Sequence, residues 1–490
     1  MGDTGIEGSR GQILQMKFFF LLIFLLHISL YPSPPDCTKP VVYRFYSNSD
    51  ILFYTQYRFP AGCDSIHSIP SDTKGFPKYP DASFRETYGS GFFSGKELNR
   101  IPDSAGYFID YCVTEITKNF QAEGNGSLDI YTTLDLDFQK YMEGQAESRF
   151  QNQKKENFSN VEVSAIALDV KTGGIRAMIG GKKYSETNKY NRALFSRRQI
   201  SSTFKPFLYA YAIESSGFLP DALFEDKPII MNDREGLPWK PKNYYPYYLG
   251  TVTLKKAIVV SINTVALQLL QLSGIPEIAG VSRKIFAMKD NMIEERITDN
   301  PSLALGSIDL SPLELAGGYL VLANNGLKFP PSGIRRIEDR NGEIFKDLYQ
   351  SSVKRKERIF TGNTIAVLTD MLKTVITDGT AKEFYQRNLD FEIAGKSGSS
   401  PADSWFAGYT PGTVVVAWAG YDFPAESKKR KLPLFIVIPF WMDLISYFRP
   451  TEKKFTIPEE LEEREFCWDT GKKPDDECTV ISGLFPKRKK

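Results

Sequence analysis

The chain has 490 residues, of which 42% are hydrophobic and 24% charged, and its formal net charge is +2. This length favours more than one domain, and the near-neutral charge argues against a nucleic-acid-binding protein, which needs a basic excess to meet phosphates. With only two histidines, His27 and His67, the chain is poorly supplied for a Ser-His-Asp mechanism or a histidine-rich metal site.

The N-terminal region contains Lys17 followed by an apolar run over residues 18–31. The run is short for a full membrane span and has the size of the apolar core of a signal sequence. No Ala-x-Ala-like cleavage site follows, so we favour an uncleaved anchor over a cleaved signal peptide, and a buried core helix is a poorer alternative. Export would suit a disulfide, and Cys467 and Cys478 close a short loop.

Residues 32–105 are rich in Pro, Ser, Gly and Tyr and have no sustained period, so they are expected to be loosely structured. Residues 106–160 predict a helix, then a short strand, a turn at Asp135 and Asp137, and a long helix. The main domain opens near residue 161 with two alternating segments around the turn KTGG, which predict a β-hairpin.

The middle of the chain, about residues 200–380, is mostly helical, and the late segments predict antiparallel strands. An early hairpin, a helical middle and late strands indicate an α+β fold with one mainly antiparallel sheet flanked by helices. The apolar stretch 434–448 contains Pro439 and Asp443, which favours a core helix over a second membrane span. The expected divisions are 1–17 (N-terminal segment), 18–31 (anchor or signal), 32–105 (unassigned), 106–160 (linker region), 161–450 (main domain) and 451–490 (C-terminal tail).

The helical part of the main domain contains two short motifs whose side chains could take part in catalysis, Ser202-Thr-Phe-Lys205 and Ser261-Ile-Asn263. Ser202 is predicted to begin a helix, so Lys205 would lie one turn later on the same face. A lysine among apolar and cationic groups loses its proton more readily and can then accept the proton of a serine hydroxyl. Ser261 and Asn263 lie in a tight loop between two predicted helices, which would project a hydroxyl and an amide into a cleft.

The third motif, Lys396-Ser-Gly398, lies on a predicted strand. Lys396 and Gly398 would face one side of the strand and Ser397 the other. The lysine offers charge to a terminal carboxylate, and the glycine would let a substrate backbone approach closely.

Other copies of these short patterns fail on their context. Lys171-Thr-Gly173 precedes Ser202 and is typical of a hairpin turn. The Ser-x-x-Lys pairs at 71–74 and 351–354 lie in polar, non-helical stretches. A chance origin of the ordered triplet is therefore the weaker interpretation.

Several segments around these motifs resemble the transpeptidase domain of class A penicillin-binding proteins. They include QISSTFKPFLYAYAIE, VTLKKAIVVSINTVALQLL, ALGSIDLSPLELAGGYLVLANNG, TDGTAKEF and IAGKSGSS with the following DSWFAGYTPGTVVVAWAGYD. The resemblance covers about residues 104–450 and implies a transpeptidase domain at 161–450, with a mainly antiparallel sheet between helical layers. It also implies cross-linking of peptidoglycan stem peptides outside the bacterial cytoplasmic membrane, inhibition by penicillins, and no metal or cofactor.

The resemblance further implies a role for each motif residue. Ser202 would be the nucleophile, Lys205 its base and Ser261 a proton relay. Asn263 would contact the substrate amide, and Lys396 and Ser397 its carboxylate. The oxyanion hole would be the backbone N–H groups of Ser202 and Ser399. The full set of expected substrate-binding residues is Asn263, Lys396, Ser397, Gly398 and Ser399.

Two departures from the family pattern stand out. Class A members carry a glycosyltransferase domain between the anchor and the transpeptidase domain, and residues 32–105 contain no Glu-Asp-x-x-Phe-x-x-His-like stretch. We therefore expect no glycan polymerisation, with a separate polymerase as a possible partner. Ser201 replaces the usual glycine before the nucleophile, which would narrow the cleft or alter the acceptor.

Two other functions stay open at this point. A D,D-carboxypeptidase or a β-lactamase would use the same Ser202 and transfer the acyl group to water. A catalytically degenerate scaffold in a cell-wall complex would use none of the chemistry, although retention of all six motif side chains argues against it.

Overall fold

The computed structural model describes residues 41–47, 50–57, 104–119, 127–151, 160–185, 187–233, 235–286, 296–297, 299–338, 344–347, 356–385, 389–428, 432–433 and 436–488. The predicted anchor at 18–31 and the Ser-x-x-Lys pairs at 71–74 and 351–354 lie outside these residues. Within them, no single helix is both long and apolar enough to cross a membrane. One sharply bent pair of helices, α8 (Asn263–Ser273) and α9 (Ile275–Phe286), has the required length and apolar composition when the two are taken together.

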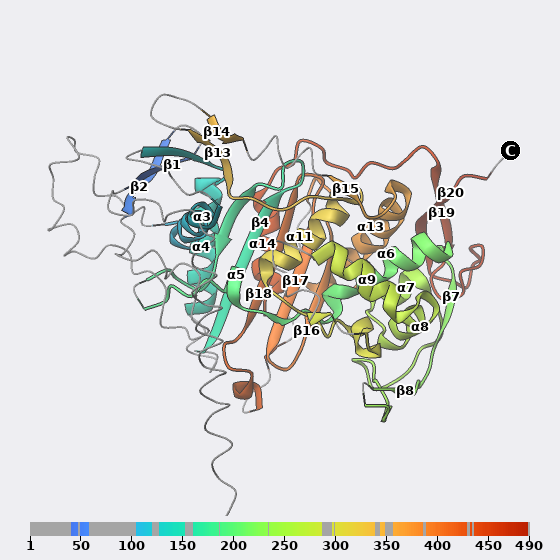
Figure 1. Ribbon diagram of the computed structural model, residues 1–490. Helices are drawn as coiled ribbons and strands as arrows, with labels where there is room; N and C mark the ends of the chain where they lie inside the picture. Colours follow the sequence, from blue (N-terminus) through green and yellow to red (C-terminus); the bar gives the residue numbers. More distant parts are fainter. Residues whose placement is uncertain are drawn as a thin grey trace, which may run out of the picture.

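A five-stranded sheet forms the centre of the molecule, in the order β16-β17-β18-β4-β5 (Figure 1). All its neighbours are antiparallel. The strands are β4 (Val161–Asp169), β5 (Ile175–Ile179), β16 (Ala394–Ser399), β17 (Asp403–Tyr409) and β18 (Thr413–Tyr421). The two ends of the main domain therefore pair in one sheet, as the sequence predicts.

Alternating side chains of β18 divide the core into two layers. Val414, Val416 and Trp418 face the larger cluster, and the intervening Val415 and Ala417 face the smaller one. This period of two is the property of a strand buried on both faces. Both faces of the sheet must therefore be covered by helices, and they are.

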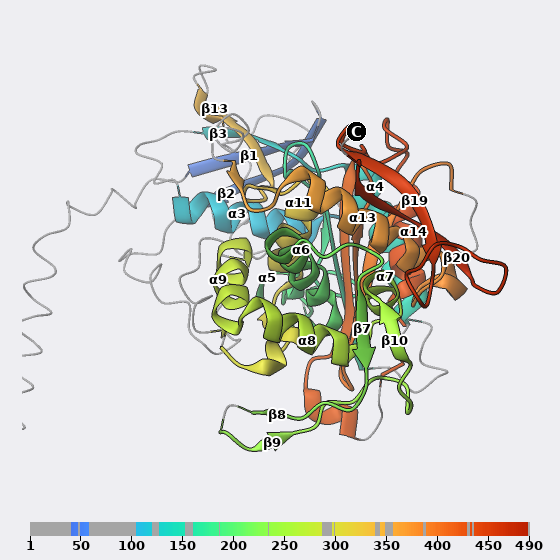
Figure 2. The same ribbon diagram turned by 90° about the vertical axis from the view of Figure 1, so that its right-hand side faces the viewer.

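The larger cluster is built from helices that precede and follow the motifs, and Figure 2 shows them stacked in front of the sheet. They are α6 (Lys205–Ser216), α7 (Leu254–Val259), α8, α9, α11 (Pro312–Ala323) and α13 (Gly362–Thr377). The opposite face is covered by α4 (Leu136–Gln151) and α14 (Ile438–Tyr447). Because α14 is buried in this layer, the stretch 434–448 contains a core helix, as predicted.

Helix ends follow the sequence signals closely. α6 ends at Gly217 in the left-handed conformation, with φ 66°. α11 begins with a capping box in which Ser311 and Glu314 each bond the other's backbone N–H. The predicted turn at 171–173 joins β4 and β5, where Gly173 has φ 71°.

A second five-stranded sheet has the order β14-β13-β3-β1-β2. Its strands are β1 (Val41–Ser47), β2 (Asp50–Tyr57), β3 (Ser127–Thr132), β13 (Ile334–Glu338) and β14 (Ile344–Asp347). The β1–β3 pair is parallel and the other pairs are antiparallel. The expectation of loose structure across 32–105 is therefore wrong for residues 41–47 and 50–57, whose β-branched and aromatic residues favour strands.

The C-terminal segment also differs from a simple tail. β19 (Leu461–Cys467) and β20 (Val480–Pro486) form an antiparallel hairpin, and Leu461 and Leu484 belong to the larger core cluster. Cys467 and Cys478 form a disulfide at the end of this hairpin. The hairpin is thus an integral part of the fold, and the structure joins Cys467 to Cys478, a pairing that the sequence left open.

Candidate active site

A short two-stranded pair positions the turn that contains Ser202. β6 (Arg198–Gln199) pairs with β11 (Asp309–Leu310), and the backbone N–H of Ile200 donates to Ile308 O at 3.0 Å. A 3₁₀ turn, η3 (Ser201–Phe204), follows and leads directly into α6. Ser202 therefore lies in a 3₁₀ turn, and Lys205 is the first residue of the α-helix.

Ser201, immediately before Ser202, has φ 52°. This left-handed region favours glycine, because a Cβ there crowds the following carbonyl. The backbone of Gly306 lies against Ser201, since a Cβ on Gly306 would come within 1.9 Å of Ser201 O. The position before the nucleophile therefore carries backbone strain.

Lys205 is fully buried and donates from Nζ to oxygens of the second motif. The acceptors are Ser261 O at 2.7 Å, Ser261 Oγ at 3.2 Å, Ile262 O at 3.3 Å and Asn263 Oδ1 at 2.7 Å. An ammonium has three N–H groups, so these contacts share its donors. The structure thus joins the lysine of the first motif to both polar residues of the second.

The second motif lies between α7 and α8, as the sequence predicts. Ser261 has φ 63°, which turns the chain sharply between the two helices. Asn263 is the first residue of α8, and its Nδ2 donates to Lys242 O at 2.7 Å. Both ends of the Asn263 amide are therefore engaged by the protein itself.

The third motif lies on β16, beside η3. Lys396 is fully buried and Nζ donates to Ser397 O at 3.1 Å. Ser397 Oγ lies 2.7 Å from Thr380 Oγ1, and Ser397 is half-buried whereas Lys396 and Gly398 are buried. The predicted alternation of Lys396 and Ser397 across the strand is thus present.

The structure explains the glycine at position 398 differently from the sequence prediction. A Cβ at this position would come within 2.6 Å of Ile200 O and 3.0 Å of Thr203 N. The glycine therefore allows β16 to pack against the turn that carries Ser202. Close approach of a substrate backbone is not needed to explain it.

Burial sets the protonation of the two lysines. Desolvation, and then the charge of Lys396, hold the pKa of Lys205 well below its usual value. Desolvation lowers the pKa of Lys396 to about 7. Both shifts favour the neutral amine, which is the form that can accept a proton.

Sequence reasoning missed several residues that hold the motifs in place. Asn243 Oδ1 accepts from the N–H groups of Asn263 and Thr264, at 2.9 and 3.4 Å, and its Nδ2 donates to buried Asp226 at 2.7 Å. Thr380, in the TDGTAKEF segment, reaches Ser397. No local pattern marks these residues, because their partners lie 17–21 positions away.

An ion pair lies directly behind the Ser202 turn. Arg198 Nε donates to Asp403 Oδ1 at 2.7 Å; Asp403 is buried and the Arg198 side chain is 11% exposed. Trp418 Nε1 donates to the same carboxylate oxygen at 3.0 Å. The pair connects β6, which precedes Ser202, to β17 of the central sheet.

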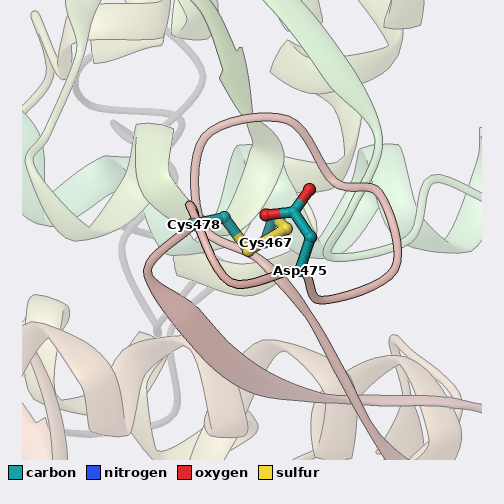
Figure 3. A group of neighbouring side chains, drawn as sticks. All are labelled: Cys467, Asp475 and Cys478. Atoms are coloured by element: carbon teal, nitrogen blue, oxygen red, sulfur yellow. A yellow bond between two sulfur atoms is a disulfide. The ribbon is translucent and has the colours of Figure 1, made fainter.

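Among the described residues, one group has the spacing of metal ligands, namely Cys467, Asp475 and Cys478 (Figure 3). Both sulfur atoms are joined in the disulfide, so neither is a thiolate that could bind a metal.

Residues 163–430 match the family model described as the penicillin-binding protein transpeptidase domain. The chain belongs to this family. Its similarity to "Penicillin-binding protein 1A" of Aquifex aeolicus is 32% identity over 312 residues, covering 63% of this chain and 41% of that protein. "Penicillin-binding protein 2D" of Bacillus subtilis is 31% identical over 328 residues, covering 65% and 45%. The chain therefore spans less than half the length of these penicillin-binding proteins.

Solved structures share the penicillin-binding fold at lower identity. Penicillin-Binding Protein 1A from Haemophilus influenzae aligns with a TM-score of 0.70 and 18% identity, covering 83% of this chain and 81% of that one. The penicillin-binding protein PonA1 from Mycobacterium tuberculosis aligns with a TM-score of 0.56 and 19% identity, covering 68% and 87%. The α+β fold with an antiparallel sheet flanked by helices is thereby confirmed.

Proposed function

We propose that this chain is a peptidoglycan D,D-transpeptidase that cross-links stem peptides through an acyl-enzyme on Ser202 and is inhibited by penicillins. The observation that carries the proposal is the contact of buried Lys205 with Ser261 and Asn263. Lys205 begins α6, directly after the turn that contains Ser202. This arrangement supplies a nucleophile, a base of lowered pKa and a relay without histidine.

In the proposed first step, Ser202 Oγ attacks the carbonyl carbon of the penultimate D-Ala. Its proton passes to the neutral amine of Lys205, and Ser261 Oγ, 3.2 Å from Nζ, relays a proton to the departing amine. The bond to the terminal D-Ala breaks, and D-Ala leaves. In the second step an amine on a neighbouring strand attacks the ester, which frees Ser202 and forms the cross-link.

The remaining motif residues would bind the substrate. A bound terminal carboxylate would favour the ammonium form of Lys396, which would attract it, and Ser397 is available to hydrogen-bond it if its hydroxyl turns from Thr380. Asn263 would exchange its contact with Lys242 O for the substrate amide. The N–H groups of Ser202 and Ser399 would stabilise the tetrahedral oxyanion, and removal of one such donor costs about a hundredfold or more in rate.

The location and partners form part of the same proposal. The apolar run at 18–31 would anchor the chain in the bacterial cytoplasmic membrane, with residues 161–450 on the extracytoplasmic side. The disulfide between Cys467 and Cys478 suits an oxidising compartment. The absence of glycan polymerisation stays a prediction, with a separate polymerase as partner.

The test is covalent labelling with a fluorescent penicillin. We expect stable labelling of the full chain, no labelling of Ser202→Ala, and at least about hundredfold slower labelling of Lys205→Arg, whose guanidinium stays protonated. A folded protein that takes no label would refute the proposal and favour the scaffold. A label that is lost by rapid hydrolysis would favour a β-lactamase.

The second alternative is a D,D-carboxypeptidase, which penicillin labelling does not distinguish. Incubation with a stem pentapeptide and a second peptide bearing a free amine separates the two. A cross-linked dimer supports transfer, whereas release of D-Ala with no dimer supports hydrolysis.

A further inference from the structure

The C-terminal disulfide closes the loop that joins β19 to β20. Cys467 and Cys478 are separated by 11 positions, and the carboxylate of Asp475 lies beside the two sulfurs (Figure 3). Backbone bonds tighten the loop further, with Gly471 N–H donating to Cys467 O at 2.9 Å and Trp468 N–H to Thr479 O at 2.8 Å. The loop, which we call the cystine loop (467–478), therefore has a defined shape.

The cystine loop contacts the N-terminus of α7 through Thr253. Thr253 is fully buried and is the N-cap of α7, where its Oγ1 accepts from the N–H of Lys256. The same hydroxyl donates to Trp468 O at 2.8 Å. One hydroxyl thus joins the helix cap to the loop.

Two more contacts fix the loop to this region. Lys256 Nζ forms an ion pair with Asp469. The backbone at Gly471, with φ 65°, lies so close to Asp221 that a Cβ would come within 2.4 Å of Asp221 O. β20 adds an anchor of its own, because buried Lys255 donates to Ser482 O and to Asp370 of α13, each at 2.7 Å.

α7 depends on such contacts because it is only six residues long. A helix of this length is not stable by its own backbone bonds, so caps and packing determine its position. Its C-terminal end runs directly into the second motif, where Ser261 N–H donates to Ile258 O at 3.2 Å and Ile262 N–H to Ala257 O at 2.8 Å. A displacement of α7 would therefore move Ser261.

Ser261 in turn positions the base. Its carbonyl oxygen accepts from Lys205 Nζ at 2.7 Å and its hydroxyl lies 3.2 Å from the same atom. We infer that the cystine loop is a positioning element for the reaction at Ser202, acting through Thr253 and α7 on Ser261 and Lys205. This inference rests on the proposed function for its kinetic consequence, but not for its structural one.

The experiment compares the unmodified full chain with three kinds of change. In the first, a dithiol transfers two electrons and two protons to the cystine, giving two thiols and an oxidised cyclic dithiol. In the second, Cys467→Ser and Cys478→Ser are combined. In the third, Thr253→Val removes the bridging hydroxyl and Thr253→Ser, the matched control, retains it.

The kinetic readout is penicillin acylation, separated into its binding constant and its chemical rate constant, across a pH series. We expect the reduced, double-serine and Thr253→Val proteins to lose about tenfold or more in the chemical rate constant, because small displacements of catalytic groups are costly. Their pH profiles should shift, because the surroundings of Lys205 change. Thr253→Ser should behave as the unmodified chain.

A purely structural loop would give another result. If the melting temperature falls while the chemical rate constant and pH profile stay unchanged, the inference is wrong. Unchanged acylation after confirmed loss of the disulfide has the same meaning.

Hydrogen exchange separates this inference from the proposed function. Amides of residues 254–264 should exchange faster after reduction or in Thr253→Val, even in a chain that takes no penicillin label. Unchanged exchange there would overturn the positioning role. Absence of label in the oxidised chain, with the exchange effect present, would overturn only the proposed function.

Discussion

Lys205 Nζ lies 2.7 Å from Asn263 Oδ1, so the lysine of the first motif is hydrogen-bonded to the asparagine of the second. The two residues are 58 positions apart and come from different helices, α6 and α8. With Ser261 as a further acceptor, Lys205 is held among neutral oxygens in a buried site where Lys396 is the neighbouring charge that lowers its pKa. Burial first, and then the charge of Lys396, hold the pKa of Lys205 well below its usual value, and this favours the neutral amine that a base requires.

Burial is the main cause of the lowered Lys205 pKa, and the charge of Lys396 is expected to add to it and so to move the pH dependence of acylation. Its positive charge disfavours the Lys205 ammonium, so removing it in Lys396→Met should raise the Lys205 pKa. Penicillin acylation should increase with pH in both proteins, with the midpoint of the rise at higher pH in the variant. The effect should be largest below about pH 7, where Lys396 is charged.

The matched control for that profile is Lys171→Met. The Lys171 side chain is 72% exposed and pairs with Glu452 on the surface. Its profile should overlay that of the unmodified chain. A midpoint that moves to lower pH in Lys396→Met would contradict the assignment of Lys205 as the base.

Ser201→Gly should stabilise the protein. Ser201 has φ 52°, and a non-glycine residue pays about 1–2 kcal/mol there, partly offset by the greater freedom of glycine in the unfolded chain. We expect a gain of about 0.5–1 kcal/mol in the free energy of unfolding, measured by urea denaturation. Ser201→Ala removes the hydroxyl but keeps the strain, so it should give no gain; equal gains in both would attribute the effect to the side chain.

Gly306→Ala should damage the Ser202 turn. Gly306 has φ 76°, and a Cβ would lie 1.9 Å from Ser201 O, so backbone must move. We expect a loss of roughly 3 kcal/mol or more in unfolding free energy, with much slower penicillin labelling.

Gly217 provides the comparison for Gly306. It has a similar φ of 66° at the end of α6, but no atom within 4 Å of a built Cβ. Gly217→Ala should therefore cost only the conformational penalty, about 1 kcal/mol, and leave labelling unchanged. Equal losses at the two glycines would show that the contact with Ser201 does not matter.

Asp403→Asn should be strongly destabilising. The change leaves Arg198 charged and without its carboxylate partner, in a site where the two side chains are only 11% and 6% exposed. Breaking a buried pair in this way costs about 3–5 kcal/mol. Thermal and urea unfolding measure the loss directly.

The surface pair Lys171–Glu452 is the control for the buried pair. Its side chains are 72% and 59% exposed, so solvent screens the interaction. Glu452→Gln should change the free energy of unfolding by less than about 0.5 kcal/mol. Comparable losses in the two variants would mean that burial of the Arg198–Asp403 pair has no special weight.

Local patterns predicted the main domain well. The hairpin of β4 and β5, the helical middle of the chain and the core helix α14 all appear where periodicity and turn signals placed them. The N-terminal strands β1 and β2 were missed. β1 pairs in parallel with the distant β3, with Val42 opposite Ser127, and β2 pairs with β1 at the edge of this sheet. The hairpin of β19 and β20 was similarly read as a tail.

For the candidate site, too, local sequence patterns predicted some features and the tertiary structure was needed for others. The sequence by itself determined the three motifs, their order and the helix, loop and strand that carry them, because spacing, turn residues and helix ends are properties of neighbouring residues. Only the tertiary structure decided that Lys205 bonds to Ser261 and Asn263, and that Gly398 makes room for the Ser202 turn. These contacts join residues far apart in the chain, and close packing of the helices on the sheet brings them together.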